Sequence, residues 1–216
     1  MEAIIETLQR ETQVMVCAPS NAAVDWISSI LTRRGVHVLR VGNPVRMSNE
    51  MLECSYERRY AAHPDYVELW NIRKTLRQKK SSDDENARRR QRLRERQTEL
   101  EIKINEELFG HARVVACTLI GSAYSILERR HFPTLFIDEA AQALEPACWT
   151  AILRADRVVL SGDYQQLPPT IKCYEAMRQG LGRTLMEQIV ARHPEAVMML
   201  NVQYRMNETL MRFSSE

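Results

Sequence analysis

Short apolar runs rich in β-branched residues recur along the chain and are separated by segments of helical spacing. The runs cover residues 14–18, 36–41, 114–117, 134–137, 158–160 and 197–202. None of them alternates with polar residues, which is typical of strands buried on both faces of a parallel sheet. Because strands and helices follow one another in turn, the pattern predicts an α/β fold with a doubly wound parallel sheet.

Two of the intervening helices have clear apolar faces. The apolar positions are Trp26, Ile27, Ile30 and Leu31 in the first helix and Leu181, Leu185 and Ile189 in the second. The first follows Ser20 and Asn21, which are residue types that often cap a helix N-terminus. We therefore expect both helices to pack these residues against the sheet.

The stretch from Pro64 to Leu108 carries no strand pattern and predicts a helical hairpin. Its apolar stripes are Leu69, Ile72 and Leu76 in the first half and Leu93, Leu100, Ile104 and Leu108 in the second. Residues 81–84, Ser-Ser-Asp-Asp, form a turn and helix-cap signal between the stripes. Because the rest of each helix is polar, we expect two antiparallel helices that project from the sheet or lie across its surface.

Composition is that of a soluble globular protein, with 44% hydrophobic and 27% charged residues. No apolar run approaches the roughly 18 residues of a membrane-spanning helix, and the acidic start of the chain is unlike a signal peptide. The five cysteines are scattered, without the close pairs of a zinc or disulfide framework. These features argue against membrane and secreted proteins and lead us to expect the cytoplasm or the nucleus.

Arginine dominates the basic residues and is concentrated in the predicted hairpin. Between Arg73 and Arg96, eleven basic residues face four acidic ones, a local excess of seven positive charges. The arginine fork binds phosphate well, so this excess is compatible with nucleic-acid binding. A solvated helix face and a surface that docks a protein partner are the alternatives.

An acidic pair follows the apolar run at residues 134–137. A strand of this kind delivers Asp138 and Glu139 to its carboxyl end, where ligands bind in open α/β sheets. There the first acid can hold Mg²⁺ and the second can polarise the water that attacks a γ-phosphate. Taken alone, the pair also fits an ordinary helix cap.

Two further segments carry polar residues directly after apolar runs. Gly162, Asp163 and Gln166 follow the run at 158–160, and a Pro-Pro pair then fixes the exit path of the chain. Tyr204 and Arg205 follow the last run, where the ring can stack on a base while the guanidinium reaches phosphate. Each segment alone also fits an ordinary turn or helix start.

In this order and spacing, the three segments resemble motifs II, III and IV of superfamily 1 helicases. The resemblance is to the branch that contains the nonsense-mediated-decay helicase, senataxin and the immunoglobulin mu-switch-binding helicase. Residues 18–25, Ala-Pro-Ser-Asn-Ala-Ala-Val-Asp, are similar to motif Ia of that branch. The likeness runs nearly end to end and implies a RecA-like P-loop NTPase fold with an inserted helical hairpin. Tyr164 and Gln165 depart from the His-Lys pair common in the family.

The resemblance also implies cofactors and roles by position. ATP and Mg²⁺ would be the cofactors, with Asp138 holding the ion through water and Glu139 activating the attacking water. Gln166 would sense the γ-phosphate, and Arg205 would touch it from a second domain. The nucleotide-binding positions would be Gly162, Asp163 and Tyr204, with the Tyr204 ring on adenine. The implied partner is single-stranded DNA or RNA, whose backbone would contact Pro19, Ser20, Asn21 and Thr118.

A helicase of this kind also needs the phosphate-binding loop GxxxxGK[ST]. None of the seven glycines stands in such a sequence. We therefore expect residues 1–198 to be an incomplete first RecA-like domain, with a helical insertion at about 50–110, and residues 199–216 to begin a second. By this reading the chain is part of a helicase that translocates from 5′ to 3′ and is inactive alone. The alternatives are a non-catalytic nucleic-acid-binding module that uses the arginine-rich hairpin and an interaction scaffold.

Overall fold

The structure, a computed structural model, describes residues 1–77, 84–202 and 207, without the side chains of residues 84–86. Five parallel strands form one sheet in the order β2-β3-β1-β4-β5. The strands are β1 (Val14–Ala18), β2 (Val38–Arg40), β3 (Val114–Thr118), β4 (Phe132–Ile137) and β5 (Ala155–Leu160). The expected α/β fold with a parallel sheet is confirmed.

Helices flank the sheet and extend from it. The α-helices are α1 (Glu2–Arg10), α2 (Asn21–Arg33), α3 (Asn49–Leu52), α4 (Tyr56–Ala61), α5 (Tyr66–Arg77), α6 (Asp84–His111), α7 (Glu145–Ile152), α8 (Tyr174–Ala176) and α9 (Leu185–Arg192). Short 3₁₀-helical turns lie at Pro44–Arg46, Ile120–Ala123, Ser125–Leu127, Ala140–Gln142 and Pro194–Ala196, and a π-helical turn at Met177–Leu181. No helix among the described residues is long and apolar enough to cross a membrane.

The central strand β1 contributes to two apolar cores, one on each face of the sheet. Val14 and Val16 point to the core that α1 and α2 cover, whereas Met15 and Cys17 point to the core beneath α7 and α9. All five residues of β1 are buried. Burial on both faces explains why the sequence of this strand is apolar throughout and does not alternate.

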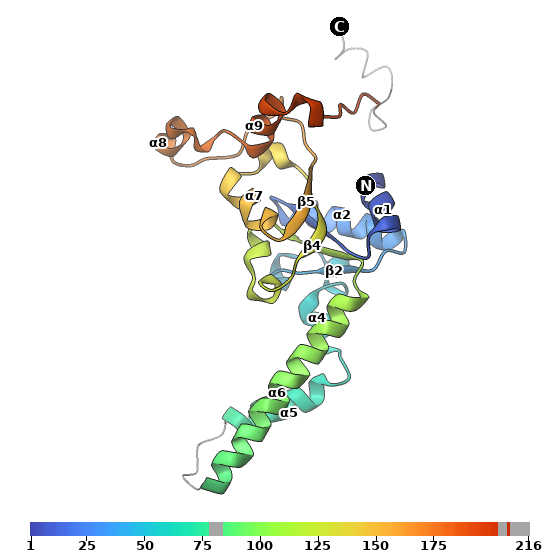
Figure 1. Cartoon of the computed structure of the whole chain (residues 1–216), viewed down its shortest axis with the longest axis vertical. Coiled ribbons are helices and arrows are strands. Elements are labelled where there is room, and N and C mark those ends of the chain that lie inside the picture. The colour runs from blue at the N-terminus through green and yellow to red at the C-terminus, as the bar shows by residue number, and fades with distance from the viewer. Residues whose placement is uncertain (78–83, 203–206, 208–216) are drawn as a thin grey trace.

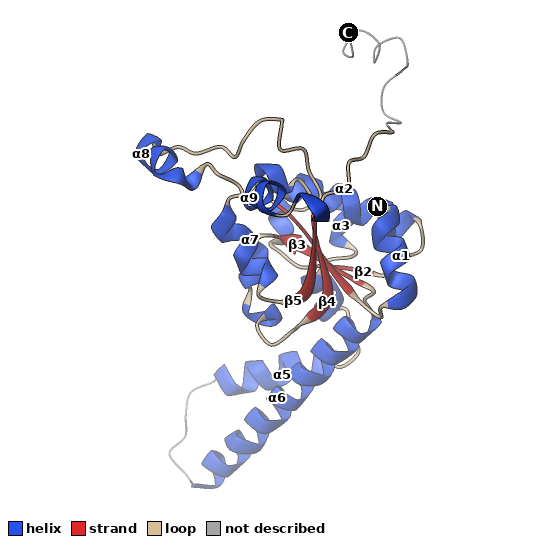
Figure 2. Cartoon of the chain, turned by 45° about the horizontal axis from the view of Figure 1, so that its top comes forward, coloured by secondary structure: helices blue, strands red, loops and turns tan. Residues whose placement is uncertain are grey.

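Helices α5 and α6 run side by side away from the sheet (Figures 1 and 2). Leu69, Ile72, Leu100 and Ile104 are buried between them in an apolar cluster of their own. Ion pairs border this cluster, including Arg73 with Glu101 at 2.8 Å and Lys103 with Asp65 at 2.6 Å. The two predicted stripes are therefore confirmed as the contact between the helices, while residues 81–83 of the turn lie outside the described residues.

Three sequence predictions differ from the structure. The strand predicted at residues 197–202 is wrong: this segment is irregular and exposed, and no described strand lies beside it to pair with. Trp26 is 64% exposed rather than packed against the sheet. Helix α9 begins at Leu185 and leaves Leu181 outside, because Thr184 and Glu187 form a capping box that starts the helix there.

The loops that follow β4 and β5 are joined by backbone hydrogen bonds and close packing. Ser161 N–H donates to the carbonyl of Ile137, and Ala140 N–H donates to the carbonyl of Ser161, both at 2.8 Å. A Cβ atom at Gly162 would lie 3.0 Å from the Ala141 nitrogen and 3.1 Å from the Ala140 nitrogen. Only glycine lets the two loops approach this closely without a shift of backbone.

Gly162→Ala should therefore push the two loops apart and lower the free energy of unfolding by about 1–3 kcal/mol. Denaturant unfolding followed by circular dichroism measures the change. Gly110→Ala is the matched control, because a Cβ there meets no heavy atom within 4 Å and the residue lies in α6. An equal loss of stability in both variants would contradict the packing described for Gly162.

Leu100→Ala tests whether the hairpin is a separate cooperative unit. Leu100 is 1% exposed between α5 and α6, so its truncation should destabilise their contact by about 2–5 kcal/mol. Because this cluster is distinct from the two sheet cores, hydrogen exchange should speed up in α5 and α6 while β1 keeps its protection. Loss of protection in β1 to the same extent would show that the clusters unfold together.

Candidate functional site

The order of the parallel strands gathers the predicted site residues along one edge of the sheet. Strands β3, β1, β4 and β5 are consecutive neighbours, and all their carboxyl ends lie at the same edge (Figure 2). Thr118 ends β3, and Pro19, Ser20 and Asn21 follow β1 directly; Asp138 and Glu139 follow β4, and Gly162, Asp163 and Gln166 follow β5. The fold therefore brings together residues that lie up to 147 positions apart in the sequence, from Pro19 to Gln166.

The two residues of the acidic pair after β4 differ in backbone conformation. Asp138 N–H donates to the Cys17 carbonyl at 2.9 Å, which continues the pairing of β4 with β1, and its side chain is half-buried. Glu139 adopts φ 53° and ψ 38° and is the single non-glycine residue with positive φ in the described part of the chain. A left-handed non-glycine residue costs about 1–2 kcal/mol, and such strain clusters at functional sites.

Glu139 has an exposed side chain, which forms a single side-chain hydrogen bond within the part of the chain that the structure describes. Gln142 Nε2 donates to its Oε2 at 3.3 Å. The carboxylate is therefore open to solvent. Gln142 has no predicted role from sequence, and its contact with Glu139 becomes visible only in the folded chain.

The loop after β5 is organised around Asp163. Its Oδ1 accepts from the backbone N–H of Gln165, and its Oδ2 accepts from Gln166 Nε2, both at 3.0 Å. An aspartate that binds the backbone two residues ahead forms an Asx-turn, which fixes the start of this exposed loop. Asp163 and Gln166 are thus in direct contact, and the backbone bonds of Ser161 link their loop to that of Glu139.

Glu145 connects the acidic loop to α9. Its carboxylate accepts from the indole of Trp149 at 3.1 Å and from Gln188 at 2.6 Å. The hydrogen bond from Trp149, followed by that from Gln188, holds the pKa of Glu145 below its usual range. A charged Glu145 therefore ties α7 to α9 next to the loop that carries the acidic pair.

The buried thiols of Cys17 and Cys148 belong to the apolar core beneath α7 and α9. Burial, together with the neighbouring Cys117 thiol at 3.6 Å, raises the pKa of Cys17. Burial raises the pKa of Cys148 to about 11. Both thiols are protonated at neutral pH and act as small apolar groups of the core.

The residues predicted to contact nucleic acid lie at two adjacent strand ends. Ser20 Oγ caps α2 by accepting from Ala23 N–H at 3.1 Å, and Thr118 Oγ1 accepts from Gly121 N–H at 3.0 Å. Each hydroxyl keeps its own hydrogen for a further acceptor. The N-terminus of the 13-residue α2 also carries the positive end of the helix dipole. This arrangement can bind an anion such as a phosphate group.

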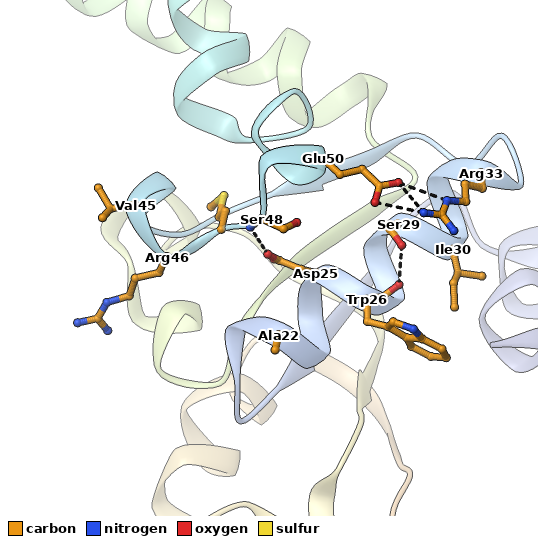
Figure 3. Close-up of a pocket in the computed structure, with 11 residues that line it drawn as sticks. Ala22, Asp25, Trp26, Ser29, Ile30, Arg33, Val45, Arg46, Ser48 and Glu50 are labelled. Atoms are coloured by element: carbon orange, nitrogen blue, oxygen red, sulfur yellow. Dashed lines mark hydrogen bonds and ion pairs between the residues drawn. The ribbon is translucent and has the colours of Figure 1, made fainter. Parts of the chain in front are cut away.

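A groove of about 640 Å³ runs along α2 (Figure 3). Ala22, Trp26 and Ile30 line it from the helix, and Val45 and Arg46 line it from the segment between β2 and α3. Its floor includes a hydrogen bond in which the Ser48 backbone N–H donates to Asp25 at 2.6 Å. The predicted adenine-stacking Tyr204 and the predicted phosphate-contacting Arg205 lie outside the described residues.

Comparisons with known proteins agree with the motifs. A family model described as an AAA domain matches residues 2–91 and 71–173, and a second model with the same description matches residues 181–216. The DNA-binding protein SMUBP-2 of Mesocricetus auratus is 34% identical over 230 aligned positions, which cover 100% of this chain and 23% of that protein.

Two further relatives extend the comparison. The DNA polymerase alpha-associated DNA helicase A of Schizosaccharomyces pombe is 30% identical and covers 100% of this chain and 34% of its own length. A regulator of nonsense transcripts 1 homolog of Arabidopsis thaliana is 34% identical and covers 96% of this chain and 16% of its own length. The chain thus spans about a third or less of each of these proteins. It belongs to the AAA domain family, within the superfamily 1 helicases related to regulator of nonsense transcripts 1.

Proposed function

We propose that this chain supplies the catalytic carboxylates and a nucleic-acid contact of an ATP-dependent helicase. The observation that carries the proposal is the acidic pair at the end of β4, where Glu139 stands exposed on a strained backbone beside the Asp163–Gln166 loop. The helicase name of the fission yeast relative supports the same activity. The helicase would couple ATP hydrolysis to movement from 5′ to 3′ along single-stranded DNA or RNA, in the cytoplasm or the nucleus.

The carboxylate of Asp138 fits a magnesium ion by its chemistry and its surroundings. Carboxylate oxygens are preferred Mg²⁺ ligands, and one carboxylate with several waters is a common arrangement. Among the described residues, no basic side chain forms an ion pair with Asp138, although the residue is half-buried. The bound ion would neutralise charge on the nucleotide phosphates.

Glu139 would accept a proton from the attacking water, because its carboxylate is exposed and its hydrogen bond to Gln142 orients it. Gln166 would sense the γ-phosphate, and its hydrogen bond to Asp163 would hold its side chain in place. Gly162 would let the loop that carries both residues approach the acidic pair. We assign Tyr204 to adenine and Arg205 to the γ-phosphate, from the beginning of a second domain at residues 199–216.

These residues do not include the phosphate-binding loop of an ATP site. No GxxxxGK[ST] sequence occurs in the 216 residues. Phosphoryl transfer depends on positioning and electrostatic stabilisation, which such a loop supplies. We therefore propose that residues 1–198, with the insertion at about 50–110, contribute to a RecA-like domain that needs this loop for activity.

Glu139→Gln tests the catalytic assignment in a chain extended at its N-terminus by a phosphate-binding loop. Turnover stimulated by single strands should fall to background, since the amide cannot take a proton from water, while ATP affinity stays within about twofold. A coupled ATPase assay and nucleotide binding by calorimetry measure the two effects. The unextended 216-residue chain should show no turnover above its own Glu139→Gln variant.

Asp138→Ala is the matched comparison in the same extended chain. It should weaken Mg·ATP binding as well as turnover, because the lost carboxylate acts on the ion rather than on water. Equal loss of nucleotide affinity in the two variants would contradict the division of roles between the adjacent acids.

The second candidate, a non-catalytic nucleic-acid-binding module, rests on the charge of the hairpin. Part of the hairpin charge is already paired with acids; Arg96, for example, contacts Glu68 and Glu99 at 2.8 Å each. Further out on α6, Arg88, Arg89 and Arg92 are exposed and form no ion pair with a described residue. These three side chains lie within about 100° of one another on a helix of 3.6 residues per turn, so they could contact one strand together.

Replacing Arg88, Arg89 and Arg92 by Gln should reduce the log–log salt slope of single-strand binding by about 2, at roughly 0.7 per lost phosphate contact. Fluorescence anisotropy at several salt concentrations measures the slope. Arg96→Gln is the control, because neighbouring carboxylates already neutralise that charge. If the triple variant binds with unchanged affinity and slope, the hairpin charge does not contact nucleic acid.

A further inference from the structure

A fully buried guanidinium joins α2 to β2. The side chain of Arg40, the last residue of β2, is 0% exposed. Its Nε donates to Asp25 Oδ1 at 2.8 Å, one terminal nitrogen donates to the Val41 carbonyl at 2.7 Å, and the other donates to Asn21 Oδ1 at 2.9 Å. The second oxygen of Asp25 accepts from the Ser48 backbone N–H, as Figure 3 shows. One arginine thus fixes the first residue of α2.

The surrounding backbone is shaped to hold this guanidinium. Gly42 has φ +152°, and a Cβ there would lie 3.0 Å from Arg40 Nη1 and 3.4 Å from the end of the Met47 side chain. A buried arginine is costly unless its charge and its donors are satisfied, and Asp25 supplies the opposite charge. The bond to Asn21 is therefore additional to charge compensation. Asn21 lies at the edge of the sheet with the other candidate nucleic-acid residues.

The contact determines which way the Asn21 amide faces. A guanidinium only donates hydrogen bonds, whereas an asparagine side chain has an accepting oxygen and a donating NH₂ group. The oxygen of Asn21 must face Arg40, so the two N–H donors face away from it. They join the Ser20 hydroxyl and the dipole of α2 at the same helix end. This set offers several donors and the positive end of a helix dipole to a ligand.

We propose that Arg40 is a positioning residue, which holds the Asn21 amide with its N–H donors turned toward a phosphate of a bound single strand. The inference rests on the proposed nucleic-acid contact at the N-terminus of α2 and adds a residue that does not touch the ligand. Arg40 acts through Asn21. Loss of Asn21 removes the hydrogen bond from its amide to the phosphate. Loss of Arg40 should remove the same bond, because the amide is then no longer held in place.

A double-mutant cycle tests the coupling between the two residues in the full 216-residue chain. The variants are Asn21→Ala, Arg40→Lys and the double variant, and the probe is a fluorescein-labelled single-stranded oligothymidylate followed by anisotropy. Lysine keeps a positive charge near Asp25 but loses the fork that reaches Asn21. Each single variant should weaken binding about threefold to tenfold, the range of one net hydrogen bond.

In the Asn21→Ala background, Arg40→Lys should weaken binding by less than about twofold more, because its target is already gone. A purely structural role for Arg40 would instead multiply the two losses, and that result would overturn the proposal. Circular dichroism at the assay temperature verifies that each variant is folded.

Asn21→Asp provides a test that does not depend on how well the Arg40 variant folds. The aspartate keeps an acceptor for Arg40, so the melting temperature should not fall, but it replaces the two donors with negative charge. Binding should be weaker than in Asn21→Ala. Asn71→Ala, an exposed asparagine on α5, is the control and should bind as the wild type does. Wild-type affinity in Asn21→Asp would refute the proposal.

The outcome also separates this proposal from the proposed function. If the wild-type chain binds the oligothymidylate and the hairpin variants weaken it while the Asn21 variants do not, nucleic-acid binding stands and the role of Arg40 is wrong. If the wild-type chain does not bind at any salt concentration, the contact at α2 is wrong and the role of Arg40 is wrong with it.

Discussion

Burial of strands β1 to β4 decides where the polar residues of the sheet can lie, whereas the edge strand β5 is partly exposed. Strand β1 lies between β3 and β4, and its alternate residues enter two different cores. A strand in this position has no exposed face on which to carry polar chemistry. Because all five strands run in the same direction, the polar residues follow the strand ends and meet at one edge. The acidic pair, the Asp163 loop and the cap of α2 are neighbours for this reason.

Two close contacts convert this shared edge into a defined site. Gly162 allows the loop after β5 to pack against the backbone of the acidic loop, and Glu139 accepts a left-handed conformation within it. The second contact is the buried Arg40, which fixes the start of α2 through Asp25 and Asn21. Both contacts are made by residues of the edge itself, so the geometry of the site depends directly on packing in the sheet.

Sequence predicted the elements whose residues repeat with a clear period or lie in a recognisable order. The stripes around Leu69 and Leu100 correctly predicted the contact between α5 and α6. The apolar segment before Asp138 correctly predicted strand β4 and the place of the acidic pair at its end. Sequence patterns failed where contacts with other parts of the fold decide the outcome. The largely apolar segment 197–202 has no described strand to join. Trp26 continues an apolar helix face but is exposed. The partnership of Arg40 with Asp25 spans 15 positions without any period, although a lone acid among the buried apolar residues of α2 was an available signal.

We propose that the carboxyl edge of the sheet is the surface that meets the single strand. Hydrogen exchange of the 216-residue chain, measured with and without a single-stranded oligonucleotide, tests it most directly. Binding at this edge should slow exchange at the start of α2 and in the turn after β3, around Asn21 and Gly121. Slower exchange confined to α5 and α6, with no change at this edge, would contradict it.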